Sequence, residues 1–203
     1  MVVHDANPLD VPAPPWDYNP SAWRRRIPIC VLAGVAFVIS AYLALYQWRL
    51  IGAVWDPLFG EQSQRVLDSD VSHEMQRWLG VPDGALGAIA YLGDVVLGLA
   101  GSTRRWQYRP WLVALFGLLV IPVGGVSALL VLTQFAVLGQ RCFLCLAVAA
   151  ISLTILYLAY GEVWASLQYL RRVWRRTRNW RSVARVFWGR SDADGEAAAL
   201  EVR

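Results

Sequence analysis

Charged side chains are scarce in this chain, in which Lys, Arg, Asp and Glu together make up 17% of the residues, against about 25% in ordinary soluble domains. Lysine is absent, so the 19 residues counted as Lys or Arg are all Arg. Most of them lie in three clusters that flank apolar runs. A nucleic-acid-binding face would need polar surroundings that these clusters lack. The net charge of +4 therefore indicates membrane topology, and no nucleic-acid partner is expected.

Apolar residues make up 57% of the chain and are concentrated in four long runs. Runs of this length predict an all-α integral membrane protein, a bundle of four transmembrane helices. The expected helices cover residues 27–48, 84–101, 111–138 and 142–160. The first run is too long for the apolar core of a signal peptide, and no small-x-small cleavage site follows it. It is therefore interpreted as an uncleaved helix.

The segments outside the helices differ in composition. The expected organisation is a disordered tail (1–26), the membrane domain (27–160), a basic amphipathic helix (161–190) and a second disordered tail (191–203). Within the membrane domain, a hydrated outer loop (49–82) follows the first helix. Interleaved Arg and Trp are typical of a helix that lies on an anionic lipid bilayer. With four spans, all three Arg clusters fall on one side, so the positive-inside rule places both termini in the cytoplasm.

Cys142 and Cys145 form a Cys-x-x-Cys pair where the fourth apolar run begins. Such a pair can close a disulfide ring, bind a metal with further ligands, or remain two thiols. At the first turn of a helix, unpaired amides and the helix dipole favour a thiolate. A structural zinc site would need two further Cys or His ligands nearby. The only histidines are His4 in the expected cytoplasmic tail and His73 in the outer loop, so no metal site is expected. Leu146 follows the second cysteine, where attachment of c-type haem would need His.

Two further residues stand out within the apolar runs. Asp94 lies in the second run, and an ionisable group at membrane depth is expected to face the bundle. A packing hydrogen bond to Ser127 or Gln134 would explain it, and a proton relay is the alternative. Cys30 is expected near the cytoplasmic end of the first helix, too far from the pair for a disulfide, which needs Cα atoms within about 7 Å. It is interpreted as an inert buried residue.

Three segments carry a family resemblance. They are Asp56-Pro57-Leu58 with Ser63–Ser69 in the outer loop, Gly80–Tyr91 at the start of the second helix, and Cys142-Phe143-Leu144-Cys145. Together with the four apolar runs, they resemble the vitamin K epoxide reductase family, including its bacterial disulfide-forming members, over about residues 27–160. The resemblance implies a quinone-dependent thiol–disulfide oxidoreductase of the bacterial cytoplasmic (inner) membrane.

The resemblance also implies roles for residues of the outer half. Cys145 matches the cysteine that reacts with a bound quinone, and Cys142 matches the cysteine that exchanges with thiols in the loop. Ser69 matches a loop serine linked to catalysis. The implied product of the reaction is a quinol and a Cys142–Cys145 disulfide, which is then passed by thiol exchange to an exported protein such as a thioredoxin-like thiol oxidoreductase.

The implied quinone, a ubiquinone or menaquinone, is expected between the helices near Cys145. Asp83 stands where the family usually has Asn near a quinone carbonyl, and Tyr91 matches a residue deeper in the same helix. Ala149 lies one turn beyond Cys145 on the same helix face and is expected beside the quinone.

The outer loop departs from the family pattern. Relatives carry a second cysteine pair there, but the matching positions of this chain are Trp55 and Ser63. Either a partner reaches Cys142 directly, or another protein supplies the shuttle thiols, or the redox role has been lost. The alternative function is a non-catalytic membrane protein of the same fold that binds a quinone, a lipid or a protein partner.

Overall fold

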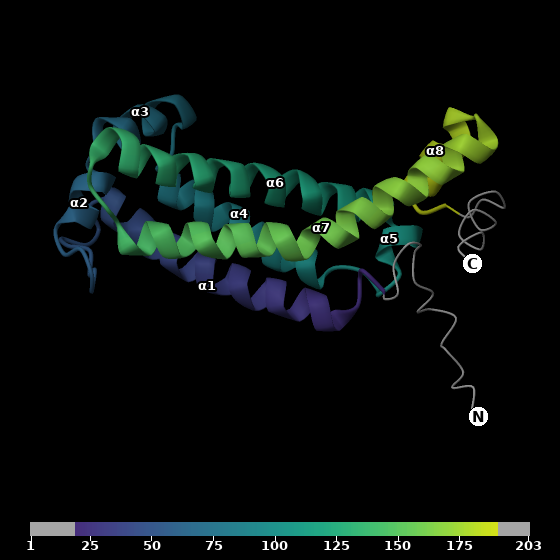
Figure 1. Ribbon diagram of the computed structural model, residues 1–203, viewed down its shortest axis with the longest axis horizontal. Coiled ribbons are helices and arrows are strands. Elements are labelled where there is room, and N and C mark those ends of the chain that lie inside the picture. The colour runs from purple at the N-terminus through teal and green to yellow at the C-terminus, as the bar shows by residue number, and fades with distance from the viewer. Residues whose placement is uncertain (1–18, 191–203) are drawn as a thin grey trace. The chain divides into compact units, whose positions relative to one another are not determined.

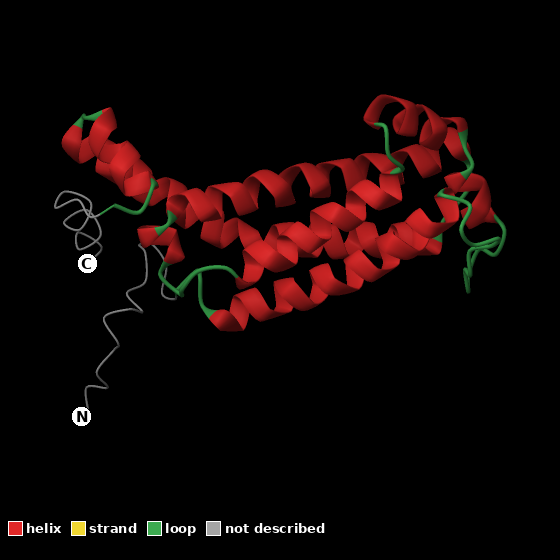
Figure 2. Ribbon diagram, turned by 180° about the vertical axis from the view of Figure 1, so that it is seen from behind, coloured by secondary structure: helices red, strands yellow, loops and turns green. Residues whose placement is uncertain are grey.

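The computed structural model describes residues 19–190, and within that range every element of secondary structure is helical (Figures 1 and 2). The elements are α1 (Trp23–Gln47), α2 (Gln62–Leu67), α3 (Asp70–Leu79), α4 (Asp83–Leu99), α5 (Arg105–Tyr108), α6 (Pro110–Thr133), the π-helix η1 (Gln134–Leu138), α7 (Phe143–Thr177) and α8 (Trp180–Phe187). Most of the first expected tail, residues 1–18, and all of the second, residues 191–203, lie outside the described residues.

Three helices are long and apolar enough to cross a membrane, namely α1, α6 continued by η1, and α7. The fourth expected span corresponds to α4, which has 17 residues. At 1.5 Å per residue α4 is about 25 Å long, somewhat less than the ~30 Å hydrocarbon layer. These three long helices and the shorter α4 are consistent with the bundle of four spans expected from the apolar runs.

Helix boundaries differ from the expected ones at both ends of the chain. Residues 23–26, expected in the tail, form the first turn of α1. At the other end α7 continues through residues 161–177, which were expected to form part of a separate amphipathic helix. The chain leaves helical geometry at Arg178, whose φ is 51°, and Asn179 then caps α8. The expected basic helix is therefore divided between the end of α7 and α8.

Packing divides the chain into two compact units, which are described separately. The arginine unit comprises the described residues 19–29, 97–118 and 157–190. The cysteine unit comprises residues 30–96 and 119–156. The helices α1, α4, α6 and α7 each contribute a segment to both units.

The arginine unit buries charged side chains in its interior. Arg105 is 0% exposed and pairs with Glu162, which is 2% exposed. Arg26 is 1% exposed, and its guanidinium donates to the carbonyl groups of Gly98 and Ala100, both at 2.7 Å, where α4 ends. Arg105 also donates to the Ala100 carbonyl, at 2.9 Å. Two of the arginines that the sequence suggested as topology signals thus also have a structural role, because they satisfy carbonyl groups at a helix C-terminus.

Aromatic and aliphatic side chains form the apolar core of the arginine unit. Its buried members are Trp106, Val113, Ala165, Tyr169, Val173 and Val186. Val186 belongs to α8, and Val183 of the same helix also packs against this core. Part of the apolar face of α8 is therefore covered by protein, whereas the amphipathic helix expected from the sequence would turn that face to lipid.

The cysteine unit consists of segments of α1, α4, α6 and α7 together with the outer loop and its short helices α2 and α3 (Figure 1). The helices α1 and α4 meet closely at Gly84, where an added Cβ would lie 2.9 Å from the backbone nitrogen of Ala44. A larger residue would push the two helices apart. Glycine therefore allows the start of α4, and with it Asp83, to lie against α1.

Candidate active site

Cys142 and Cys145 lie at the N-terminal end of α7. Cys142 immediately precedes Phe143, the first residue of the helix, and Cys145 lies within its first turn. The two cysteines are joined by a disulfide, with Cα atoms 5.3 Å apart, which is within the limit of about 7 Å for such a bond. Of the states that a Cys-x-x-Cys pair can adopt, the structure contains the disulfide.

Side chains from other segments hold the backbone around the pair. The amide of Cys142 donates to Oε1 of Gln134 in η1 at 3.2 Å. The amide of Phe143 donates to Oδ2 of Asp56 in the outer loop at 2.9 Å. Because the first amides of a helix lack partners within the helix, Asp56 acts as a capping group of α7. Its negative charge also suits the positive end of the helix dipole.

The sulfur of Cys142 has its own contact with the helix end. The amide of Cys145 donates to Sγ of Cys142 at 3.2 Å. In the reduced pair, this donor and the helix dipole would favour a thiolate at Cys142. The hydrogen bond therefore links the first cysteine to the helix end, and the thiolate expected from the sequence stays a prediction.

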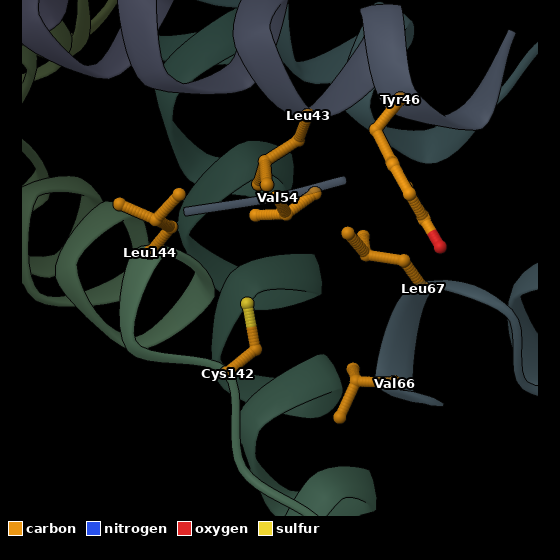
Figure 3. Packing of buried hydrophobic residues seen from close by; sticks show 7 residues of the cluster. All are labelled: Leu43, Tyr46, Val54, Val66, Leu67, Cys142 and Leu144. Atoms are coloured by element: carbon orange, nitrogen blue, oxygen red, sulfur yellow. The ribbon is translucent and has the colours of Figure 1, made fainter. Parts of the chain in front are cut away.

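The two cysteines differ in exposure. Cys142 is 0% exposed, whereas Cys145 is partly exposed. Figure 3 shows Cys142 within a cluster of apolar side chains. The other members of the drawn cluster are Leu43, Tyr46, Val54, Val66, Leu67 and Leu144. With the loop in this position, a thiol from outside does not reach Cys142.

Asp56 accepts four hydrogen bonds in the outer loop. Its Oδ1 accepts from the amides of Leu58 and Phe59, both at 2.8 Å. Its Oδ2 accepts from the Phe143 amide and from the Ser63 hydroxyl. Burial acts to raise the pKa of Asp56, but these donors outweigh it and lower the pKa below the ordinary value of 3.8. Asp56 is therefore a carboxylate at neutral pH.

Trp55 and Ser63, which stand where relatives carry loop cysteines, have different surroundings. The Trp55 side chain is 70% exposed, and its amide donates to the Tyr42 hydroxyl at 2.9 Å. Ser63 is 0% exposed, and its hydroxyl is the one that donates to Asp56. Neither side chain can accept or donate electrons in disulfide exchange. Ser63 instead helps to hold the loop.

Ser69, expected to be catalytic from the resemblance, is the N-cap of α3. Its hydroxyl accepts from the Ser72 amide at 3.4 Å and donates to the Val66 carbonyl at 2.7 Å. These bonds order the junction between α2 and α3. They give Ser69 a structural role, and its catalytic role stays a prediction.

Asp83, expected near the quinone, is the first residue of α4. Its Oδ1 accepts from Nε2 of Gln47 at the end of α1 and from the Ser72 hydroxyl, the latter at 3.4 Å. Gln47 also accepts from the Gly84 amide at 3.1 Å through its Oε1. One glutamine side chain thus links α1 to the first turn of α4 and fixes the carboxylate of Asp83.

A chain of hydroxyl groups lies deeper in the cysteine unit. The hydroxyl of Tyr91, a residue that is 2% exposed, lies 2.5 Å from Oγ of Ser152. Ser152 also accepts from the Ser127 hydroxyl at 3.2 Å. Cys145, Ala149 and Ser152 follow one another at helical spacing and so share one face of α7. A quinone needs apolar walls and hydrogen-bond donors for its carbonyls. Ala149 supplies an apolar wall, but the Ser152 hydroxyl already donates to the Val148 carbonyl at 2.8 Å. Of the Tyr91 and Ser152 hydroxyl groups, only that of Tyr91 has a proton that is not committed to the α7 backbone.

Asp94 is buried in α4 and 1% exposed. Its Oδ1 has no hydrogen-bond partner. Ser127 donates to Ser152, and Oε1 of Gln134 accepts from the Cys142 amide. The predicted hydrogen bond from either residue to Asp94 is therefore not formed, and the side chain faces the bundle interior without the partner that was expected.

Cys30, the third cysteine of the chain, makes no bond to Cys142 or Cys145. Cys30 is partly exposed, and its Sγ lies 3.9 Å from the Val95 carbonyl oxygen in α4. It forms no disulfide. Cys30 is only half-buried in the structure, so the expectation of a buried residue is wrong.

The roles of three residues that organise the site were not recognised from the sequence. Gln47 fixes Asp83, Asp56 caps α7, and Ser152 meets Tyr91. Gln47 and Ser152 share a signal that could have identified them, because each is a polar residue within or at the end of an apolar run. The capping role of Asp56 has no such signal, since it depends on how the loop folds onto α7.

These features define a multi-pass helical membrane protein with a disulfide-forming cysteine pair at a capped helix end. The vitamin K epoxide reductase family matches residues 27–160, more than half of the chain, so the protein belongs to this family. Members of the family are in general quinone-dependent oxidoreductases. The matched range includes the outer loop, the cysteine pair and the hydroxyl chain. No curated protein matches the chain.

Proposed function

We propose that this protein is a four-span membrane enzyme that couples the reduction of a quinone to formation of the Cys142–Cys145 disulfide. The observation that carries the proposal is the cysteine pair itself, which is bridged at the capped N-terminus of α7. Cys145 begins a helix face that continues through Ala149 to Ser152, where Tyr91 adds a second hydroxyl. Roughly 10 Å of helix separates Cys145 from Ser152.

The residues of this chain divide the reaction between them. A bound ubiquinone or menaquinone would accept two electrons and two protons, which the reduced pair supplies as it becomes a disulfide. Cys145, the partly exposed member of the pair, faces the quinone, and Cys142 closes the ring. The Tyr91 hydroxyl orients the quinone by turning from Ser152 to a quinone carbonyl, while Asp83 and Ala149 line its site.

The disulfide then passes to an exported dithiol protein, such as one of thioredoxin-like fold. A thiolate of the partner attacks Sγ of Cys142, the bond between the two cysteines breaks, and Cys145 leaves as a thiolate. The second thiolate of the partner attacks the mixed disulfide and releases Cys142. The partner becomes oxidised, and the protons of its thiols pass to Cys142 and Cys145, so the pair is ready for another quinone.

The proposed location is the bacterial inner membrane, with α4 as the fourth span and both termini in the cytoplasm. The three Arg clusters support this orientation, because with four spans all of them lie on one side. The cysteine pair then faces the oxidising side of the membrane, where disulfides persist.

A non-catalytic protein of the same fold is the second candidate function. Two observations favour it: Cys142 is 0% exposed, and the loop carries no cysteine that could relay electrons to it. Such a protein would bind a quinone, a lipid or a protein partner without turnover.

Thiol trapping in purified protein separates the two candidates. The protein is reduced in detergent, freed of reductant, exposed to ubiquinone-1 or menadione, and then denatured in a mass-tagged maleimide, so that buried and exposed thiols are labelled alike. Without quinone the wild type should take up three maleimide tags, and after quinone treatment only one, at Cys30. Cys145→Ala and Cys142→Ala cannot form the disulfide, so each should take up two tags with or without quinone. The matched control Cys30→Ala should be oxidised as fast as the wild type. Persistence of both thiols in the wild type with either quinone would leave the non-catalytic protein as the better candidate.

A further inference from the structure

The outer loop raises a problem of access that the proposed function alone does not answer. In the proposed exchange a partner attacks Cys142, because Trp55 and Ser63 offer no relay thiol. Yet Cys142 is 0% exposed in the oxidised protein. The loop must therefore move before exchange at Cys142 can occur, and the contacts that hold the loop determine which thiols reach this sulfur.

The apolar contacts over Cys142 shield it from solvent but do little to fix the orientation of the loop. Val54, Val66 and Leu67 pack around Cys142 from the loop side (Figure 3). Burial of such side chains is favourable without fixing orientation, because the hydrophobic effect is non-directional. The position of the loop relative to α7 must be fixed by polar links.

Two polar links join the loop to the backbone beside Cys142. Oε1 of Gln62 in α2 accepts from the Arg141 amide at 3.3 Å, and Oδ2 of Asp56 accepts from the Phe143 amide at 2.9 Å. These amides flank Cys142 on both sides. The Asp56 link is the shorter and has an ionised acceptor, and hydrogen bonds of that kind are about twice as strong as neutral ones.

Asp56 also orders the loop itself. Its Oδ1 accepts from the amides of Leu58 and Phe59 and so fixes the turn that follows it. Its Oδ2 is shared between the Phe143 amide and the hydroxyl of Ser63 in α2. One carboxylate therefore ties three elements together: the loop turn, α2 and the first turn of α7. Ser63 stands where relatives have a thiol, so a hydrogen-bonded link occupies the place of a redox-active one.

We propose that Asp56 is a positioning residue that latches the outer loop over Cys142, so that only thiols whose carrier displaces this latch reach the sulfur of Cys142. The inference rests on the proposed function for its purpose, while the latch itself is a property of the loop. Small thiols are excluded by the closed loop. A protein partner that offers backbone amides or a basic side chain to the Asp56 carboxylate replaces its bonds to Phe143 and Ser63 and opens the loop.

The partner implied by this chemistry is an exported dithiol protein with a basic or amide-rich rim around its reactive cysteine. Such a rim would satisfy the carboxylate that leaves the α7 terminus, which would otherwise remain without its donors. Asp56 thus acts as a specificity-determining contact.

The test measures how fast a charged, membrane-impermeant maleimide modifies Cys142 in the full-length protein in detergent. The Cys145→Ala background leaves Cys142 as a thiol, and Cys30 serves as a reference in the same molecule. We expect Asp56→Asn, which keeps the shape but removes the charge, to raise the modification rate of Cys142 by about ten-fold or more. The rate at Cys30 should not change.

Three matched variants sharpen the result. Asp70→Asn removes the same charge from an exposed residue of α3 and should leave the rate at Cys142 unchanged. Ser63→Ala removes one of the four donors to Asp56 and should give a smaller increase. Asp56→Glu keeps the carboxylate and should restore part of the protection, which a purely steric role of the side chain would not allow.

Two outcomes would overturn the latch. Equal rates for the wild type and Asp56→Asn would show that the carboxylate does not hold the loop. Equal increases at Cys142 and Cys30 would show that the variant only loosens the fold. Neither depends on quinone reduction. A protein that fails to oxidise its pair with a quinone, yet shows the selective increase, would retain the latch and lose the proposed enzyme activity.

Discussion

The arginine unit and the cysteine unit bury polar groups in opposite ways. In the arginine unit, Glu162 accepts two bonds from the guanidinium of Arg105, at 2.5 and 2.6 Å, and a third from the Ser21 hydroxyl. In the cysteine unit, Asp94 is buried with an oxygen that has no partner. Complete pairing of charges fixes one arrangement, whereas incompletely satisfied groups are typical of places where chemistry or movement occurs. The paired charges of the arginine unit therefore hold a single arrangement, whereas the cysteine unit contains the reactive pair.

The largest effect on stability is expected in the arginine unit. Glu162→Gln leaves the 0% exposed Arg105 without its counter-charge, which should destabilise the protein by about 3–5 kcal/mol. Thermal unfolding in detergent measures the loss. The double variant Arg105→Met with Glu162→Met should lose less than the sum of the two single variants, because no isolated charge remains. A loss equal to that sum would show that the pair acts as two independent residues.

In the cysteine unit, removal of a buried carboxyl should have the opposite sign. Asp94→Leu replaces a group whose Oδ1 has no partner, so the free energy of unfolding should rise by about 1–3 kcal/mol. The same thermal measurement applies, with Ser127→Ala as the control at a residue whose hydroxyl is bonded. If Asp94→Leu lowers the unfolding temperature, then Asp94 has a stabilising partner in the membrane. If it lowers quinone reduction while stability rises, the proton-relay alternative gains support.

Apolar run length predicted the long helices because each span must cover the hydrocarbon layer with its own side chains. Helix boundaries were missed where contacts between distant segments decide them. The first turn of α1 forms in the expected tail because the Arg26 guanidinium reaches carbonyl groups more than 70 residues away, at Gly98 and Ala100. The helix α7 runs past Tyr160 because its continuation carries Ala165 and Val173 into the core of the arginine unit.

The candidate site was predictable in part for a similar reason. The spacing of Cys142 and Cys145, and their place at the start of an apolar run, identify them as a candidate redox pair. The burial of Cys142 could not be predicted, because it depends on a loop that precedes it by about 80 residues. The same is true of Asp56, which reaches the Phe143 amide over a separation of 87 residues. Periodicity in the sequence carries no information about such docking.

Substitution of Ser69 should change stability less than the substitutions above, and it separates a structural role of this residue from a catalytic one. Ser69→Ala removes the N-cap of α3, which should destabilise the protein by about 1 kcal/mol. Quinone reduction measured well below the unfolding temperature should stay near the wild-type rate. Ser69→Asn, which keeps a capping side chain, should restore the stability. A large loss of rate in Ser69→Ala at unchanged stability would instead support the catalytic role implied by the resemblance.

The smallest effect is expected at Asp83. In Asp83→Asn an oxygen remains that can accept from Gln47 and Ser72, so the link between α1 and α4 is kept, and stability should change by less than about 0.5 kcal/mol. The rate of quinone reduction should be equal to or above that of the wild type, because a carboxylate beside a quinone opposes the negative charge that develops as the quinone is reduced. Quinol formation is followed by absorbance, with Asp83→Ala as the control that removes the acceptor. A loss in Asp83→Asn as complete as in Cys145→Ala would show that the carboxylate itself takes part in the chemistry. The cysteine unit would then contain a second reactive group besides its disulfide, at the point where Gln47 now holds it in place.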